Sequence, residues 1–209
     1  MKFVIGHPPE NPGFHPEAEH WSRLKEPSMI VALWFVGMPV SLFLGGLFYF
    51  AADSWVDFSA DQLFDEFDYW IFAVMFVLAV THERCHALLH PGWGLSPLTI
   101  YGCLPKGLAL YAHYDGPTTR TRAIAIMIAP FIALSVMPLL VACFYQPVAV
   151  MASAIAILNA AFSGLDVANT IVMIWGVPVG ALVQNKGWRS YWRIGLPASP
   201  GANVKGNTE

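Results

Sequence analysis

His82, Glu83 and His86 form a His-Glu-x-x-His pattern within the segment His-Glu-Arg-Cys-His. On a helix, side chains four residues apart project from the same face, so the two imidazoles can bind one metal ion together. Zinc is the ion that such a pair binds in metallopeptidases, and the neighbouring glutamate can hold and deprotonate a water molecule. The pattern therefore predicts a zinc site with His82 and His86 as ligands and Glu83 as the catalytic acid/base.

The motif stands at the end of an apolar run, Tyr69 to Leu89, which is long enough to cross a bilayer. Ionisable side chains are costly in hydrocarbon, about 2.5–3.5 kcal/mol for an aspartate on insertion scales, and they seldom occur there without a role. This context indicates a membrane-embedded metalloprotease. The alternative is a cluster of polar residues that faces water at the end of a helix.

The composition is that of an integral membrane protein. Of the 209 residues, 56% are hydrophobic and 12% are charged, and that charged fraction is about half of what a soluble domain carries. The net charge is −3 and no basic stripe is present, which argues against a nucleic-acid partner. Cys85, Cys103 and Cys143 lack metal-site spacing and are expected to be unpaired thiols.

Four apolar blocks stand out in the chain: Met29 to Ala52, Tyr69 to Leu89, Ala123 to Tyr145 and Pro147 to Val183. The connection between the first two blocks is acidic and has no lysine or arginine. The connection between the second and third blocks, and the segments at both ends of the chain, carry the basic residues. The positive-inside rule then places both termini in the cytoplasm. We therefore expect an all-α integral membrane protein with four transmembrane helices.

The fourth block is nearly twice as long as one span requires. We expect one long, tilted helix that runs to about Ile174 and is ended by the sequence Trp-Gly-Val-Pro at residues 175–178. Dividing the block into two spans would place the basic C-terminal segment outside, against the charge rule. The aromatic and basic residues within 188–193 are expected to form an amphipathic segment at the membrane interface.

Three regions follow from this division: a polar, proline-rich cytoplasmic tail (1–28), a membrane-embedded domain (29–194) and a disordered C-terminal tail (195–209). Residues 98–101 and 108–111 are short β-prone runs around Pro-Lys-Gly, and they predict a small cytoplasmic hairpin beside the motif. Such a hairpin could present an extended substrate strand by edge pairing. A plain connecting loop is the alternative.

Two histidines and a water molecule leave tetrahedral zinc one protein ligand short. Asp166 is the single acidic residue in the last two apolar blocks. At about 1.5 Å per helical residue, His82 and His86 lie roughly 20–26 Å from the outer surface and Asp166 lies roughly 27 Å from it. We therefore expect Asp166 to be the third ligand, with His90 and His113 as the alternatives.

Two asparagines lie near Asp166 in the sequence, Asn159 before it and Asn169 after it. Either amide could donate a hydrogen bond to a developing oxyanion or support a metal ligand. The alternative for Asp166 and both asparagines is simple hydrogen bonding between helices, which polar residues in membranes often provide.

The chain resembles a family of small bacterial membrane proteins known as putative zincin peptidases and, more distantly, the site-2 proteases. Three pieces carry the likeness: the motif at 82–86, the segment 117–123 leading into Ile-Ala-Pro-Phe at 128–131, and Ser-Gly-Leu-Asp at 163–166. The resemblance implies a zinc site of two histidines and an aspartate, matched by His82, His86 and Asp166, with Glu83 as the acid/base. It also implies a location in the bacterial plasma membrane.

These observations together favour a zinc metalloprotease that cleaves a peptide or membrane-protein substrate near the cytoplasmic face of the membrane, in contact with lipid. One alternative is a catalytically inactive scaffold on the same fold. Another is a small transporter or channel subunit in which the polar residues line a path. Against the latter, the chain shows no internal repeat. The sequence does not predict an oligomeric state.

Overall fold

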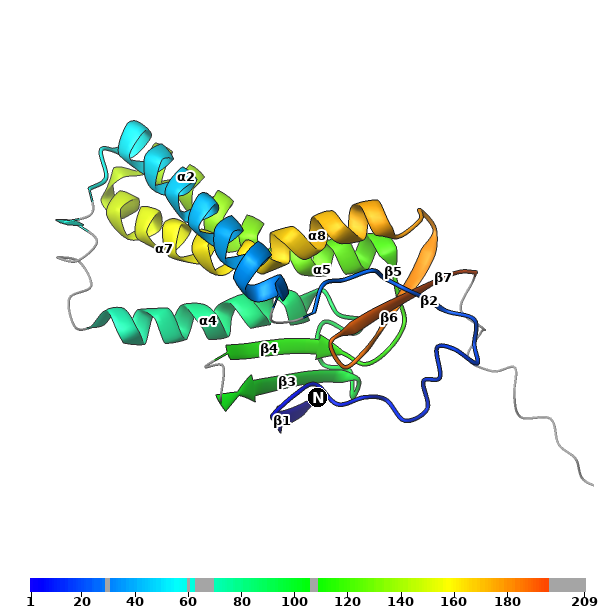
Figure 1. The fold of residues 1–209 in the computed structure, drawn as a ribbon. Coiled ribbons are helices and arrows are strands. Elements are labelled where there is room, and N and C mark those ends of the chain that lie inside the picture. Colours follow the sequence, from blue (N-terminus) through cyan, green and yellow to red (C-terminus); the bar gives the residue numbers. More distant parts are fainter. Residues whose placement is uncertain (29–30, 60, 63–69, 106–108, 196–209) are drawn as a thin grey trace, which may run out of the picture.

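The computed structural model describes residues 1–28, 31–59, 61–62, 70–105 and 109–195. Helices pack together on one side of the molecule, and two small sheets lie at the end where α4 finishes (Figure 1). The helical elements are η1 (Ala32–Gly37), α2 (Met38–Val56), α4 (Ile71–Leu88), α5 (Arg120–Phe131), η4 (Ile132–Val136), α6 (Met137–Phe144), η5 (Gln146–Val148), α7 (Ala149–Phe162) and α8 (Gly164–Gly176). The strands are β1 (Lys2–Ile5), β2 (Ser22–Arg23), β3 (Thr99–Leu104), β4 (Ala109–Tyr114), β5 (Thr118–Thr119), β6 (Ala181–Lys186) and β7 (Arg189–Ile194).

Three of the described helical segments are long and apolar enough to cross a membrane: Ala32–Val56, Ile71–Leu88 and Arg120–Phe144. A fourth span results if the bent pair Gln146–Phe162 and Gly164–Gly176 is counted as one. Large apolar side chains on these helices are exposed, among them Phe43 and Phe72. Such surfaces match a hydrocarbon environment better than water.

The fourth apolar block differs from the single long helix that its length predicts. The chain bends by 55° between Phe162 and Gly164, so that α7 and α8 run in different directions. Gly164 is required at this bend, because a Cβ atom there would lie 2.7 Å from the carbonyl oxygen of Gly37. The helix does end at Gly176, close to the predicted position.

Small residues let the helices of the bundle approach closely. Ala154, Ala156 and Ala160 on α7 are fully buried against the apolar side chains of Leu44 and Phe48 on α2. Close packing through small residues is the usual mode of helix association in membranes. The core of the bundle therefore holds α7 against α2.

The chain also forms two β-sheets, so the prediction of an all-α protein is wrong in this respect. The first sheet has the order β1-β3-β4, with β1 parallel to β3 and β3 antiparallel to β4. The predicted hairpin is confirmed as β3 and β4. The second sheet has the order β2-β7-β6-β5 and is antiparallel throughout.

Both ends of the described chain belong to these sheets. Residues 1–28, expected as a tail, contribute β1 and β2, because strands far apart in the sequence can satisfy their backbone groups with one another. Residues 188–193, expected as an interfacial amphipathic segment, instead form the turn and most of β7 in a hairpin with β6. Residues 196–209 lie outside the described residues, as do residues 60 and 63–68 of the acidic connection predicted before the second span.

Two arginines at the start of α5 bind the ends of two other helices. Arg122 donates from Nε to the carbonyl oxygen of Leu89 at the end of α4, at 3.0 Å. Arg120 donates from Nη2 to the carbonyl oxygen of Ile174 near the end of α8, at 2.8 Å. Carbonyl groups at helix ends lack helical partners and favour cations, so these contacts hold α4 and α8 to α5.

Candidate metal centre

Three potential metal ligands from two helices converge inside the bundle. The Nε2 atom of His82 lies 3.0 Å from Oδ2 of Asp166, and Nε2 of His86 lies 3.6 Å from the same oxygen. The three ligand atoms all lie within 4.8 Å of one another. Tetrahedral ligands about 2.1 Å from a zinc ion are about 3.4 Å apart, so these separations suit zinc.

Local structure explains how each ligand reaches this point. His82 and His86 are one helical turn apart on α4, with ring centroids 5.0 Å apart, and both are buried. Asp166 lies in the first turn of α8, directly after the bend, where the helix dipole favours a carboxylate. The bend therefore sets the direction from which Asp166 approaches α4.

His86 is held in the tautomer that a metal ligand needs. Its Nδ1 atom lies 2.7 Å from the carbonyl oxygen of Ile126. A carbonyl only accepts hydrogen bonds, so Nδ1 carries the hydrogen and the neutral ring keeps a lone pair on Nε2. That lone pair faces the Asp166 carboxylate, and a cation between them removes the repulsion of the two acceptors. The donor set of two imidazoles and a carboxylate therefore fits zinc.

The acceptor for His86 arises from a proline. In an α-helix the carbonyl of Ile126 would bind the N–H of residue 130, but Pro130 has none. The freed carbonyl is then available to the imidazole of His86. Sequence reasoning missed this contact, although a proline four residues after a helical carbonyl is a usable signal for a free acceptor.

Glu83 follows His82 in the sequence, but it is not one of the three residues whose potential ligand atoms lie close together. Its Oε2 atom accepts a hydrogen bond from the backbone N–H of Ala112 on β4, at 2.7 Å. The side chain is half-buried, and it lies between α4 and the sheet edge. The carboxylate is thus aimed at the β4 strand beside the metal ligands.

A family model described as "Putative zincin peptidase" matches residues 75–182, just over half of the chain. The chain belongs to this family. The matched region contains His82, Glu83, His86 and Asp166, and the zincin class uses zinc in general. Searches of curated proteins and of solved structures gave no significant match.

His90 and His113, the alternative ligands, do not join the group of three within the described residues. His90 is buried, with its ring 5.4 Å from that of Tyr114 and its Nδ1 atom 3.4 Å from Oγ1 of Thr99. His113 is buried on β4, and burial lowers the pKa of both histidines to about 4. Both imidazoles are therefore neutral at pH 7. His113 lies on β4, and the His90 ring contacts the ring of Tyr114 on the same strand.

The two asparagines occupy different surroundings. Asn159 on α7 is fully buried, and its Oδ1 atom lies 2.9 Å from Nδ1 of His82. Its amide nitrogen is directed to the carbonyl oxygen of Pro130 at 3.0 Å, away from the ligand atoms. Asn169 is half-buried on α8, three residues after Asp166. The contacts of Asn159 favour a supporting role over donation to an oxyanion.

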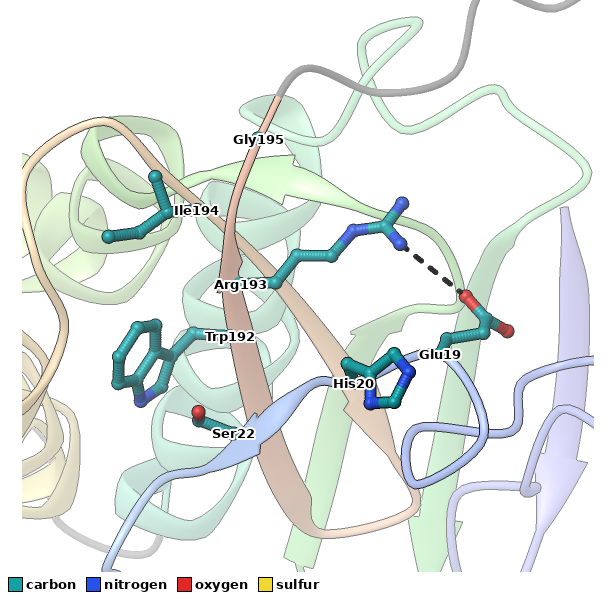
Figure 2. A pocket seen from close by; sticks show the side chains of 7 residues that line it. All are labelled: Glu19, His20, Ser22, Trp192, Arg193, Ile194 and Gly195. Atoms are coloured by element: carbon teal, nitrogen blue, oxygen red, sulfur yellow. Dashed lines mark ion pairs between the residues drawn. The ribbon is translucent and has the colours of Figure 1, made fainter.

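A surface pocket of about 620 Å³ is present near β2 and β7, and Figure 2 shows the residues that line it. Its lining includes an ion pair in which a nitrogen of Arg193 lies 3.8 Å from Oε2 of Glu19. None of its lining residues belongs to the candidate metal centre. The pocket therefore does not contain the candidate metal centre.

Proposed function

We propose that this chain is a membrane-embedded zinc metallopeptidase that hydrolyses peptide bonds near the cytoplasmic face of the membrane. The observation that carries the proposal is the convergence of His82, His86 and Asp166 at separations suited to zinc, with Glu83 beside them. Family membership supports the same class of chemistry.

The location of the site supports action near one membrane face. His82 and His86 lie in the last two turns of α4, which the structure ends at Leu88. The basic residues Arg120 and Arg122 follow at the start of α5. The positive-inside rule assigns this end of the spans to the cytoplasm. Water reaches a site near a membrane face more easily than one at the centre of the bilayer.

The chemistry divides between the metal and the protein. Zinc bound at this site would supply Lewis-acid polarisation of the scissile carbonyl and would make water more acidic. The Glu83 carboxylate would take the proton of the attacking water and pass it to the leaving amine. His82 and His86 would keep their Nε2 lone pairs directed at the metal, and Asp166 would complete the ligand set and offset the positive charge.

The edge of β4 that has no neighbouring strand among the described residues offers a place for the substrate. Within the described sheet β4 pairs with β3 on one side, and the N–H of Ala112 points to the other side, toward Glu83. An extended peptide paired with this edge would lie alongside α4 and bring a backbone carbonyl near Glu83. The substrate is thus proposed to be an extended segment of a peptide or of a membrane protein.

The test begins with zinc content, measured by elemental analysis on detergent-purified wild type beside His86→Ala and Asp166→Ala. Near-stoichiometric zinc in the wild type, lost in both variants, is the expected result. Zinc lost in His86→Ala but kept in Asp166→Ala would move the third ligand elsewhere, with His90 and His113 the next to replace. A wild type without zinc would overturn the metallopeptidase and favour a scaffold or a transporter subunit.

A further inference from the structure

Asn159 is fully buried, and its side chain contacts groups from three other helical elements. Its Oδ1 atom lies 2.9 Å from Nδ1 of His82 on α4. Its Nδ2 atom lies 3.0 Å from the carbonyl oxygen of Pro130 on α5 and 2.8 Å from Oγ of Ser135 on η4. A buried amide with this many partners has one strongly preferred orientation.

The partners determine which end of the amide faces His82. The Pro130 carbonyl only accepts, so the atom that faces it must be the nitrogen. Ser163 supports the same orientation of the amide. The Ser163 hydroxyl donates its hydrogen to the backbone carbonyl of Asn159 at 2.9 Å. The Ser163 oxygen can therefore only accept from the Asn159 side chain, and the atom 3.2 Å from it must be Nδ2. The amide oxygen therefore faces His82 and accepts, and Nδ1 of His82 carries the hydrogen.

A π-helical turn brings the two acceptors on the third span to one face. Pro130 and Ser135 are five residues apart, and on an α-helix they would lie about 140° apart around the axis. The turn η4 (Ile132–Val136) begins two residues after Pro130 and is π-helical: its backbone bonds join residues five apart, so it holds more residues per turn than an α-helix and rotates Ser135 toward the side of the Pro130 carbonyl. Ser135 is fully buried at this position. The wider turn thus directs the Pro130 carbonyl and the Ser135 hydroxyl at the same amide.

We propose that Asn159 is a positioning residue that fixes His82 in the tautomer with hydrogen on Nδ1, and that η4 serves to orient the Asn159 amide. The proposal rests on the proposed function, since a metal ion is what the free Nε2 lone pair of His82 would bind. Pro130 then supports both histidines. Its missing N–H frees the acceptor of His86, and its own carbonyl orients the acceptor of His82.

The expected effect is on metal affinity. Loss of the hydrogen-bond partner behind a metal-binding histidine lowers metal affinity by about 10- to 100-fold, because the ring can then adopt the wrong tautomer or orientation. In Asn159→Ala the Nδ1 hydrogen loses its acceptor. In Asn159→Asp a buried, protonated carboxyl group keeps both contacts: its carbonyl oxygen accepts the same hydrogen, and its hydroxyl donates to the Pro130 carbonyl. The two variants therefore separate the tautomer effect from general disturbance of the bundle.

The experiment measures zinc affinity of the full-length protein in detergent by competition with a chromophoric chelator. Melting temperatures of the metal-free variants are recorded in parallel. Ser153→Ala is the matched control, since Ser153 is also fully buried on α7 and its hydroxyl has no partner among the described residues. We expect Asn159→Ala to bind zinc 10- to 100-fold more weakly, by the reasoning above. Asn159→Asp and Ser153→Ala should bind within a few-fold of wild type.

Equal zinc affinity in wild type and Asn159→Ala would overturn the positioning role while leaving the proposed function intact. Equal losses in Asn159→Ala and Asn159→Asp would also overturn it, because a structural role alone predicts that pattern. If Asn159→Ala does not fold, Asn159→Asp still decides, since a large loss of affinity there contradicts the tautomer argument. Absence of zinc binding in the wild type would instead refute the proposed function.

Discussion

The carboxylate of Glu83 and the backbone N–H of Ala112 form a hydrogen bond of 2.7 Å that joins α4 to the edge of β4. Glu83 belongs to the His-Glu-x-x-His motif, and Ala112 belongs to the strand edge that we propose for the substrate. A peptide that pairs with this edge would compete for the Ala112 N–H. Substrate binding would then release Glu83 from β4 and leave its carboxylate free for the attacking water.

The variant Glu83→Gln should lose peptidase activity by at least about 100-fold, because the amide cannot take a proton from water. Its zinc content should stay at the wild-type level, since Glu83 is not one of the three candidate ligands. Peptide cleavage and elemental analysis on the same preparation would check both parts. Wild-type turnover in this variant would show that another group acts as the base.

The variant Ala112→Pro removes the N–H that Glu83 binds. The β3–β4 pairing should survive, because this N–H points away from β3 and proline is tolerated at such edge positions. We expect kcat/KM for peptide cleavage to fall by up to about tenfold, because the substrate loses one backbone hydrogen bond to the edge of β4. Zinc content should not change.

Ala112→Ser is the control for this prediction, since it changes the side chain and keeps the N–H. It should retain kcat/KM close to that of wild type. If Ala112→Pro cleaves peptides as well as Ala112→Ser does, substrate pairing at the β4 edge is wrong.

The variant Pro130→Ala should weaken zinc binding by about tenfold. Alanine supplies the N–H that proline lacks, and this N–H can bind the Ile126 carbonyl in place of His86. Chelator competition measures the effect. Pro39→Ala, a substitution in α2, is the control and should leave zinc affinity unchanged. Unchanged affinity in Pro130→Ala would show that the Ile126 contact does not support the metal.

Stability should depend on pH through His113. Burial lowers the pKa of His113 in the folded protein to about 4, below its ordinary value of 6.5. The unfolded chain therefore binds the proton more readily between these two values, so stability falls as pH decreases from about 6.5 to about 4. Full protonation of this group would cost on the order of 3 kcal/mol.

His113→Leu should show a flatter decline in melting temperature than wild type over this pH range. His15 is exposed, and His15→Gln is the control that should follow the wild-type curve. The comparison uses metal-free protein, so that zinc loss does not contribute. Parallel curves for wild type and His113→Leu would show that His113 is not held neutral by its surroundings.

Short-range patterns in the sequence predict part of this structure. The apolar runs predict the long helices because crossing a membrane requires about 20 apolar residues. The β-prone runs on either side of Pro105 predict the pairing of β3 with β4, since the two strands are close together in the sequence. The pairing of β1 with β3 joins residues about a hundred positions apart, and no local pattern encodes such a pairing.

The candidate site also has one part that local sequence patterns predict and another that depends on the tertiary structure. Helical periodicity alone places His82 and His86 on one face of α4 with Glu83 beside them, because four residues make about one turn. Asp166 could be suggested from its depth, but its approach depends on the bend before α8. The acceptors behind the two histidines, Asn159 and the Ile126 carbonyl, come from helices that pack against α4 only in the folded chain. Spacing along one helix thus determined the position of the two histidines of the candidate site, while the packing of four helical segments decided how Asp166 joins them and how their rings are oriented.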